Sequence, residues 1–303
     1  MGRFKTTRYS ASYSFYCCSI FGLFSVPAPL FRTCVNGGVF LLADSINTSP
    51  QTAMWNLHNS VARLESSDIL AALDIEKPYE GLYVERACVN RALGARILRL
   101  NASQDDDIYP AVQEYYARGK DVVATYTPTR TGAVRAQVYW RYHQFDVEQG
   151  PAVGVELIVS MQTSLLDSDP SASVITSIPC DEVWACELDD DASQFERLQL
   201  SIARPTVWTE KGSRTVHLFR PQNRNVSYVE VVHEEDGQLA RMELAAGSRP
   251  TVHCETSLFG EPLEKGVIRR GRVWGMFVPR SNDFDAALTC LREIAAAPLP
   301  LTT

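Results

Sequence analysis

The sequence lacks the short motifs that mark most catalytic and metal-binding folds. GxSxG, GxGxxG and GxxxxGK[ST] are all missing, which disfavours a serine hydrolase, a Rossmann dehydrogenase and a P-loop enzyme. HExxH and CxxC are missing too, and the five histidines are scattered along the chain. The sequence therefore predicts no metal and no cofactor.

A basic surface and a membrane span are also missing. The net charge is −7, so a nucleic-acid partner is not expected. The uncharged run from Tyr9 to Phe31 is broken by polar residues and by Pro27 and Pro29. A span needs about twenty strongly apolar residues, so no integral membrane helix is predicted.

The eight cysteines fit no common zinc spacing, and Cys180 and Cys186 are six positions apart. Reduced, mostly buried thiols in a cytoplasmic protein are the expectation. The alternative is an exported protein with some disulfides, if the first segment of the chain is a signal peptide.

Residues 1–53 differ from the rest of the chain. They carry four basic residues against Asp44, a net charge of +3, which leaves −7 − 3 = −10 for the remainder. We expect either a disordered or mis-assigned extension, with translation beginning at Met54, or a signal peptide. A third alternative makes them part of the fold. Residues 54–303 are predicted to form a single β-sandwich domain with a C-terminal helix.

Strand patterns dominate from Gly81 onward. Val, Ile, Thr, Tyr and Trp are enriched in about a dozen segments separated by short polar turns such as Glu235-Asp236-Gly237. Helices are predicted only at Ser66–Leu73, Ile108–Arg118 and Phe284–Ala296. Alternating βαβ units are absent, so the fold class is mainly β. We expect a large antiparallel β-sandwich, supersandwich-like, with a few short helices.

One predicted strand carries a polar stripe on alternate positions. Successive strand side chains point to opposite faces, so one face is polar and the other is a core face made of Val134, Ala136, Val138, Trp140 and Tyr142. The polar face combines groups that stack on sugars or hydrogen-bond to hydroxyls and carboxylates. Its residues are Arg135, Gln137, Tyr139, Arg141 and His143. An ordinary solvated sheet face is the alternative.

A second strand, from Gly266 to Val278, carries Arg270, Arg272 and Trp274 on one face. Arginine suits carboxylates and phosphates because its geometry is bidentate, so an anion or uronic-acid site is one interpretation. The alternative is charge pairing along the strand. These three residues and the polar stripe together form the predicted ligand-binding set.

Catalytic candidates are few. His253 and Glu255 share one strand face and are suited to general acid–base chemistry, and His143 is a further candidate. Surface exposure alone would also explain the pattern.

The block Leu258–Pro279 and the ending Pro298–Thr303 resemble an uncharacterised group of bacterial proteins of planctomycete type. At fold level, the strand-dominated chain is similar to the galactose mutarotase-like sandwiches. That resemblance implies sugar binding on a concave sheet face and, in epimerase members, a catalytic His and Glu. His253 with Glu255, or His143 with Glu156, are the pairs that could fill those roles.

Three functions follow as hypotheses. The first is carbohydrate binding without catalysis, the second is an enzyme acting on a sugar or sugar acid, and the third is a structural or protein-interaction module. The expected partner is a carbohydrate or a small anionic ligand.

Overall fold

The computed structural model describes residues 54–102, 110–128, 133–180, 182–187, 194–201, 206–210, 215–222, 224–233, 235–245 and 250–297. Residues 48–303 form one compact unit. The expectations for residues 1–53 lie outside the described residues, so the proposed extension and signal peptide stay predictions.

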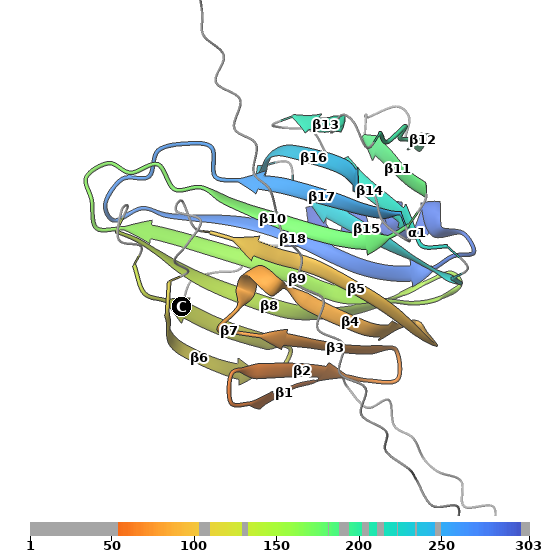
Figure 1. Cartoon of the computed structure of the whole chain (residues 1–303), viewed down its shortest axis with the longest axis horizontal. Helices are drawn as coiled ribbons and strands as arrows, with labels where there is room; N and C mark the ends of the chain where they lie inside the picture. Colours follow the sequence, from red (N-terminus) through yellow and green to blue (C-terminus); the bar gives the residue numbers. More distant parts are fainter. Residues whose placement is uncertain are drawn as a thin grey trace, which may run out of the picture. The chain divides into compact units, whose positions relative to one another are not determined.

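Two nine-stranded antiparallel sheets make up the described fold, which confirms the mainly β sandwich (Figure 1). We call the first sheet A. In spatial order it contains β1 (Met54–His58), β2 (Val61–Glu65), β3 (Ile69–Asp74), β4 (Leu82–Ala87), β5 (Val89–Asn101), β10 (Ala172–Pro179), β17 (Thr251–Leu258), β16 (Gly237–Ala245) and β13 (Thr206–Glu210).

We call the second sheet B. In spatial order it contains β12 (Glu196–Arg197), β11 (Glu182–Glu187), β14 (Thr215–Arg220), β15 (Val226–Val232), β18 (Ile268–Pro279), β9 (Gly150–Thr163), β8 (Val134–Val147), β7 (Asp121–Tyr126) and β6 (Val112–Arg118). The described helices are the short 3₁₀ helix η1 (Pro78–Glu80) and α1 (Asp283–Ala296).

The main core lies between the sheets. On β8 the predicted apolar positions are all buried, including Trp140 at 0% exposure, whereas the alternate positions are exposed or half-buried. Residues of sheet A such as Leu64 and Met242 belong to the same apolar cluster. The predicted inward and outward faces of β8 are therefore confirmed.

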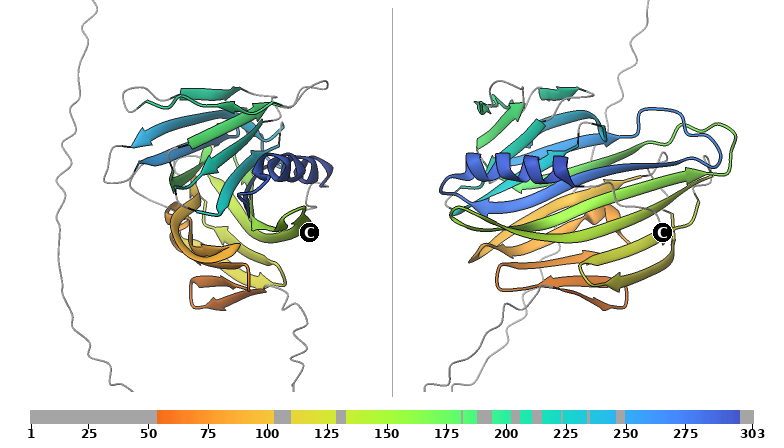
Figure 2. Two further views of the ribbon diagram at one scale, coloured as in Figure 1. Left: turned by 90° about the vertical axis from the view of Figure 1, so that its right-hand side faces the viewer. Right: turned by 180° about the vertical axis from the view of Figure 1, so that it is seen from behind.

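A second core forms on the outer face of sheet B. Helix α1 buries Ala287, Cys290 and Ile294 against β14, β15 and β18. Figure 2 shows α1 lying on this face, with β9, β8 and β7 continuing beside it uncovered by the helix. The predicted C-terminal helix is confirmed, because its apolar positions at helical spacing face the sheet.

Two predicted helices are wrong. Residues 69–74 form strand β3, which pairs with β2 and β4 and buries alternate side chains, and Ser66 Oγ accepts the backbone N–H groups of Asp68 and Ile69 in the turn that precedes it. A serine that caps a helix makes the same local bonds in a turn, so the sequence signal is ambiguous. Residues 112–118 form edge strand β6, whose side chains are largely exposed on both faces, so their spacing carried no burial information.

The cysteines that the structure describes are mostly buried, as the sequence predicted. Among the described residues, Cys88, Cys180, Cys186, Cys254 and Cys290 are free thiols, and all but Cys88 are buried. Burial raises the pKa of Cys290 to about 12, so its thiol stays protonated and unreactive.

A carboxyl group lies inside the core between the sheets. Glu230 on β15 is fully buried, and its Oε2 accepts hydrogen bonds from Thr176 Oγ1 (2.5 Å) and Tyr228 Oη (2.9 Å). Its Oε1 has no hydrogen-bond partner among the described residues. Burial raises the pKa of Glu230 to about 7, and burial lowers the pKa of its ladder neighbour His217 to about 3.

These two groups predict opposite pH dependences of the free energy of unfolding. The fold favours protonated Glu230, so the contribution of Glu230 to the free energy of unfolding falls as the pH rises from 4.5 to about 7. The fold favours neutral His217, so the contribution of His217 grows as the pH rises from about 3 to 6.5. Between pH 4.5 and 6.5 the two slopes cancel in the wild type. Glu230→Gln should leave a rising slope of about 1.4 kcal/mol per pH unit, and His217→Gln a falling one.

Urea unfolding at several pH values across this range measures both slopes. If both variants keep the pH profile of the wild type, the assignment of these protonation states is wrong.

Candidate functional site

The strand register brings the two predicted polar strands onto one surface. Strand β9 lies between β8 and β18 in sheet B. The polar stripe of β8, the alternate residues Arg270, Arg272 and Trp274 of β18, and their partners on β9 all point away from the core between the sheets. Arg141 and Trp274 both pair with Glu156, one from each side. In the next row but one, Gln137 and Arg270 both pair with Ser160. The outer face of sheet B, from β6 to β18, is therefore the candidate site.

At the β7 side of this face the polar groups bind one another. Arg141 donates to both carboxylate oxygens of Asp121, at 2.7 and 3.2 Å, and this pairing raises the pKa of the guanidinium. Tyr139 Oη donates to Gln137 Oε1 at 2.8 Å, and Gln137 Nε2 donates to Thr125 Oγ1 at 3.3 Å. These bonds hold the side chains of the predicted stripe in fixed positions.

A histidine–carboxylate pair lies at the centre of the face. His143 Nε2 is 2.8 Å from Glu156 Oε2, and the imidazole stacks on the Trp274 indole with ring centroids 4.2 Å apart. Burial raises the pKa of Glu156, but His143, the Trp274 indole N–H and Arg141 outweigh it, so the pKa is lowered overall. Glu156 is therefore a carboxylate at neutral pH, and it can accept the imidazole N–H and hold the ring in one orientation, as a carboxylate beside an acid–base histidine does.

The most accessible part of the face lies next to β6. Tyr116 is 44% exposed and shares a row with Tyr139, with Val123 between them. Arg270 Nε donates to Ser160 Oγ at 3.1 Å, and the charge of Arg270 acts on the Tyr139 hydroxyl, although burial keeps the pKa of Tyr139 raised. Aromatic rings, a guanidinium and hydroxyl groups therefore lie side by side.

Arg135 extends the face toward its end. It is exposed, and its guanidinium donates to the side-chain oxygen of Gln162 on β9. Arg135, Gln137, Tyr139, Arg141, His143 and Arg270 therefore lie on one face of sheet B, and their role in ligand binding stays a prediction.

Arg272 and Trp274 share this face but are not accessible. Arg272 is 1% exposed, and it donates to Asp236 Oδ2 at 3.1 Å and to the backbone oxygen of Ala297 at 3.4 Å. Trp274 is 3% exposed, between His143 and the apolar cluster under α1. The sequence could not show this, because the cover comes from α1 and from the β15–β16 turn.

His253 and Glu255 lie on the other layer of the sandwich. They point outward from β17 in sheet A, whereas His143 points outward from sheet B. His253 Nδ1 is 2.8 Å from Ser177 Oγ, and Glu255 pairs in the ladder with Ile175 and Arg241. The structure therefore does not bring His253 into the candidate site.

Several residues of the site were missed by the sequence patterns. Ser160, Asp121 and Tyr116 lie on the face only because β9, β7 and β6 pair with β8. On β9 the burial pattern is nearly continuous, so no polar alternation marked Ser160.

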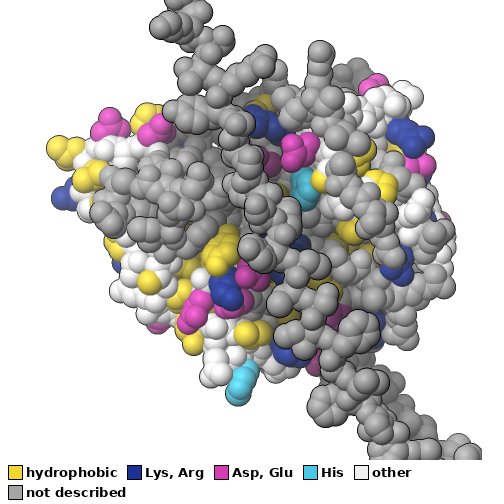
Figure 3. All heavy atoms as spheres, viewed as in Figure 1, with side chains coloured by type: hydrophobic (Ala, Val, Ile, Leu, Met, Phe, Trp, Pro, Cys, Tyr) yellow, Lys and Arg dark blue, Asp and Glu magenta, His cyan; other side chains and the backbone are white. Residues whose placement is uncertain are grey.

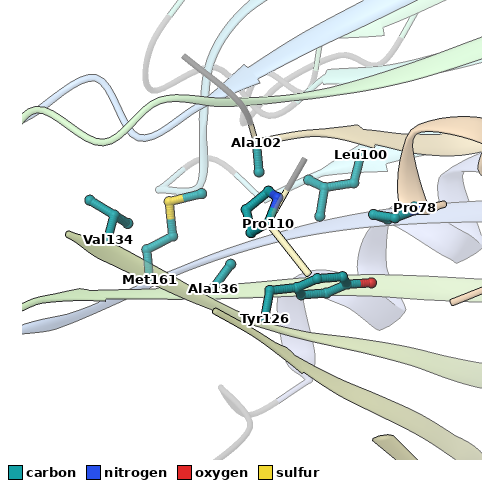
Figure 4. Close-up of a pocket in the computed structure, with 8 residues that line it drawn as sticks. All are labelled: Pro78, Leu100, Ala102, Pro110, Tyr126, Val134, Ala136 and Met161. Carbon is teal, nitrogen blue, oxygen red and sulfur yellow. The ribbon is translucent and has the colours of Figure 1, made fainter. Parts of the chain in front are cut away.

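A cavity in the core is too small and too apolar to be an alternative ligand site to the outer face of sheet B. It has a volume of about 20 Å³, room for about one water molecule, and Figure 4 shows its lining. The lining residues are Pro78, Leu100, Ala102, Pro110, Tyr126, Val134, Ala136 and Met161. The Tyr126 hydroxyl donates to the Ile75 carbonyl, so it offers no donor to a ligand.

The described residues contain no group of three or more histidine, cysteine or acidic side chains that could hold a metal ion. In the same part of the chain, no helix has the length and hydrophobicity needed to cross a bilayer.

No protein-family model matches the chain, and no curated protein does. Among solved structures, it is similar to the galactosidase domain of the α-galactosidase–sucrose kinase AgaSK, with 7% identity and a TM-score of 0.39 over 75% of this chain and 42% of that one. It is also similar to the GH36 α-galactosidase AgaA from Geobacillus stearothermophilus, with 8% identity and a TM-score of 0.33 over 63% and 29%.

The A355E D548N form of AgaA in complex with raffinose matches with 8% identity and a TM-score of 0.35, over 72% of this chain and 40% of that one. The chain therefore spans less than half of each of these structures. At these TM-scores the likeness carries no argument about function. The resemblance to an uncharacterised bacterial group stays a prediction.

The Arg272–Asp236 pair yields a stability prediction. Asp236→Ala leaves the buried guanidinium uncompensated, so the free energy of unfolding should fall by about 3 to 5 kcal/mol. The double variant Arg272→Met/Asp236→Ala removes both charges and should lose less. Denaturant unfolding measures both, and an equal loss in the two variants would contradict a charge-burial cause.

Proposed function

We propose that this protein binds carbohydrate on the outer face of sheet B, without catalysis there. The observation that carries the proposal is the grouping of Tyr139, Arg270 and Gln137 on adjoining rows, next to the exposed ring of Tyr116. Tyrosine rings stack on the apolar faces of sugars, while guanidinium and amide groups bind hydroxyls.

The geometry suits an extended ligand better than an enclosed one. Tyr116 and Tyr139 lie two strands apart in one row. Neighbouring strands are about 4.8 Å apart, so the two rings can contact successive sugar units. Helix α1 packs on β14, β15 and β18 (Figure 2), whereas Tyr116 on β6 is 44% exposed and Tyr139 on β8 is half-buried, so both rings can be reached from solvent.

The charge on the face favours sugars that carry a carboxylate. Arg270 and Arg135 border the tyrosines, whereas the carboxylate of Glu156 is 3% exposed and bonded to His143. Guanidinium groups bind carboxylates bidentately. Neutral sugars can use the same donors through their hydroxyls.

Binding should depend on two residues of the face. Arg270→Gln removes a charged donor and should weaken binding by about 10- to 100-fold. Tyr139→Ala removes a stacking platform and should weaken it by about 3- to 10-fold. Affinities for neutral and uronic-acid oligosaccharides, measured by titration calorimetry, check both.

The matched controls are Arg241→Gln and Tyr83→Ala, exposed residues of sheet A, which should leave binding unchanged. The proposal fails if no saccharide binds the wild type, or if the control variants weaken binding as much as the site variants.

A second candidate function is proton transfer on a sugar by His143 and Glu156. The 2.8 Å contact between Nε2 and Oε2 is the observation that favours it, because an orienting carboxylate is what a histidine acid–base needs. Such a pair would accelerate the interconversion of sugar anomers, taking a proton from the anomeric hydroxyl and returning one to the ring oxygen.

Polarimetry of galactose and glucose tests this candidate. We expect the wild type to accelerate the change in rotation and His143→Gln to lose at least about 100-fold of that acceleration. His58→Gln, on the exposed edge strand β1, is the control. A spontaneous rate in the presence of wild-type protein excludes the function.

A further inference from the structure

A serine, a histidine and a glutamate lie in one row on the outer face of sheet A. Ser177 on β10 and Glu243 on β16 are the ladder partners of His253 on β17, one on each side. All three side chains point away from the core, and Figure 3 looks onto this face, where acidic and basic side chains are interspersed. Three neighbouring strands thus supply a hydroxyl, an imidazole and a carboxylate.

The hydrogen bonds around Ser177 determine which neighbour receives the proton of its hydroxyl group. Arg99 Nη1 on β5 donates to Ser177 Oγ at 3.5 Å, and Arg99 Nε is held by the Tyr79 carbonyl at 3.0 Å. Because the guanidinium donates into the oxygen, the hydroxyl proton is available for His253 Nδ1, which lies 2.8 Å away. A nucleophile and a base within hydrogen-bond reach, with a third group beside the base, is the arrangement of an activated serine.

The electrostatics keep the imidazole in its basic form. Burial lowers the pKa of His253 and the charge of Arg99 lowers it further, while Glu243 across the ladder partly offsets both. Glu255 is the other titratable group on this face of the strand. His253 is therefore neutral at neutral pH and can accept the proton of Ser177.

We propose that Ser177, His253 and Arg99 form a second site, in which Ser177 attacks small carboxylic esters. Ser177 Oγ bonds to the carbonyl carbon as its proton passes to His253 Nδ1, and Arg99 stabilises the oxyanion. The carbon–oxygen bond to the alcohol then breaks, and the alcohol leaves with the proton from His253. Water, deprotonated by the same imidazole, hydrolyses the acyl-serine to the acid and restores Ser177.

A fluorophosphonate probe tests the site, because Ser177 Oγ would bond to phosphorus and displace fluoride. Peptide mass spectrometry of the labelled full-length protein should locate the adduct on Ser177. The labelling rate should rise with pH through a midpoint below 6.5, the ordinary histidine value. Ser177→Ala should abolish this adduct, and His253→Gln should slow labelling by at least about 100-fold.

Ser257→Ala is the matched control, since Ser257 occupies the same face of β17, and it should label at the wild-type rate. Tyr139→Ala should also label normally, which separates this site from carbohydrate binding on sheet B. Circular dichroism verifies that each variant is folded. Absence of an Ser177 adduct in the wild type, or equal rates in wild type and His253→Gln, reduces the row to a structural hydrogen bond and overturns the proposal.

Discussion

The candidate surface depends on strand β9, which is almost continuously buried and pairs along its length with β8 on one side and β18 on the other. Its inner face contributes Val155, Leu157 and Val159 to the main core. Its outer face places Glu156 between Arg141 and Trp274, which come from segments more than 100 residues apart in the sequence. Because side chains alternate strictly along a strand, a shift of one residue in either ladder would send these groups into the core.

The two layers separate the chemistry of the protein. Every outward-facing group of sheet B lies on the opposite side of an apolar core from those of sheet A, so His143 and His253 cannot act on one substrate. Each sheet instead assembles its own set from neighbouring strands. This follows from sandwich architecture, in which only the outer faces meet solvent, and it allows one face to bind a ligand while the other carries different reactivity.

The parity of β8 and β18 was predictable because it follows from a period of two within one segment. The amphipathic helix α1 was predictable for the same reason, with a period of 3.6. The sequence could not predict the burial of Arg272 or the sheet in which His253 lies. Both depend on pairings between strands that are distant in the sequence. The serine beside His253 was likewise invisible, since Ser177 lies 76 positions away in the sequence.

The two buried glutamates show why local partners, more than burial itself, set the chemistry of this fold. Glu156 and Glu230 are 3% and 0% exposed, yet the pKa of Glu156 is lowered and that of Glu230 is raised to about 7. Glu156 faces His143 and Arg141, which favour its charged form, whereas the groups that hydrogen-bond to Glu230, from Thr176, Tyr228 and Cys254, are neutral and do not outweigh its burial. A buried carboxyl group stays charged where its neighbours favour the charged form, as for Glu156, and it is protonated up to about pH 7 where they do not, as for Glu230.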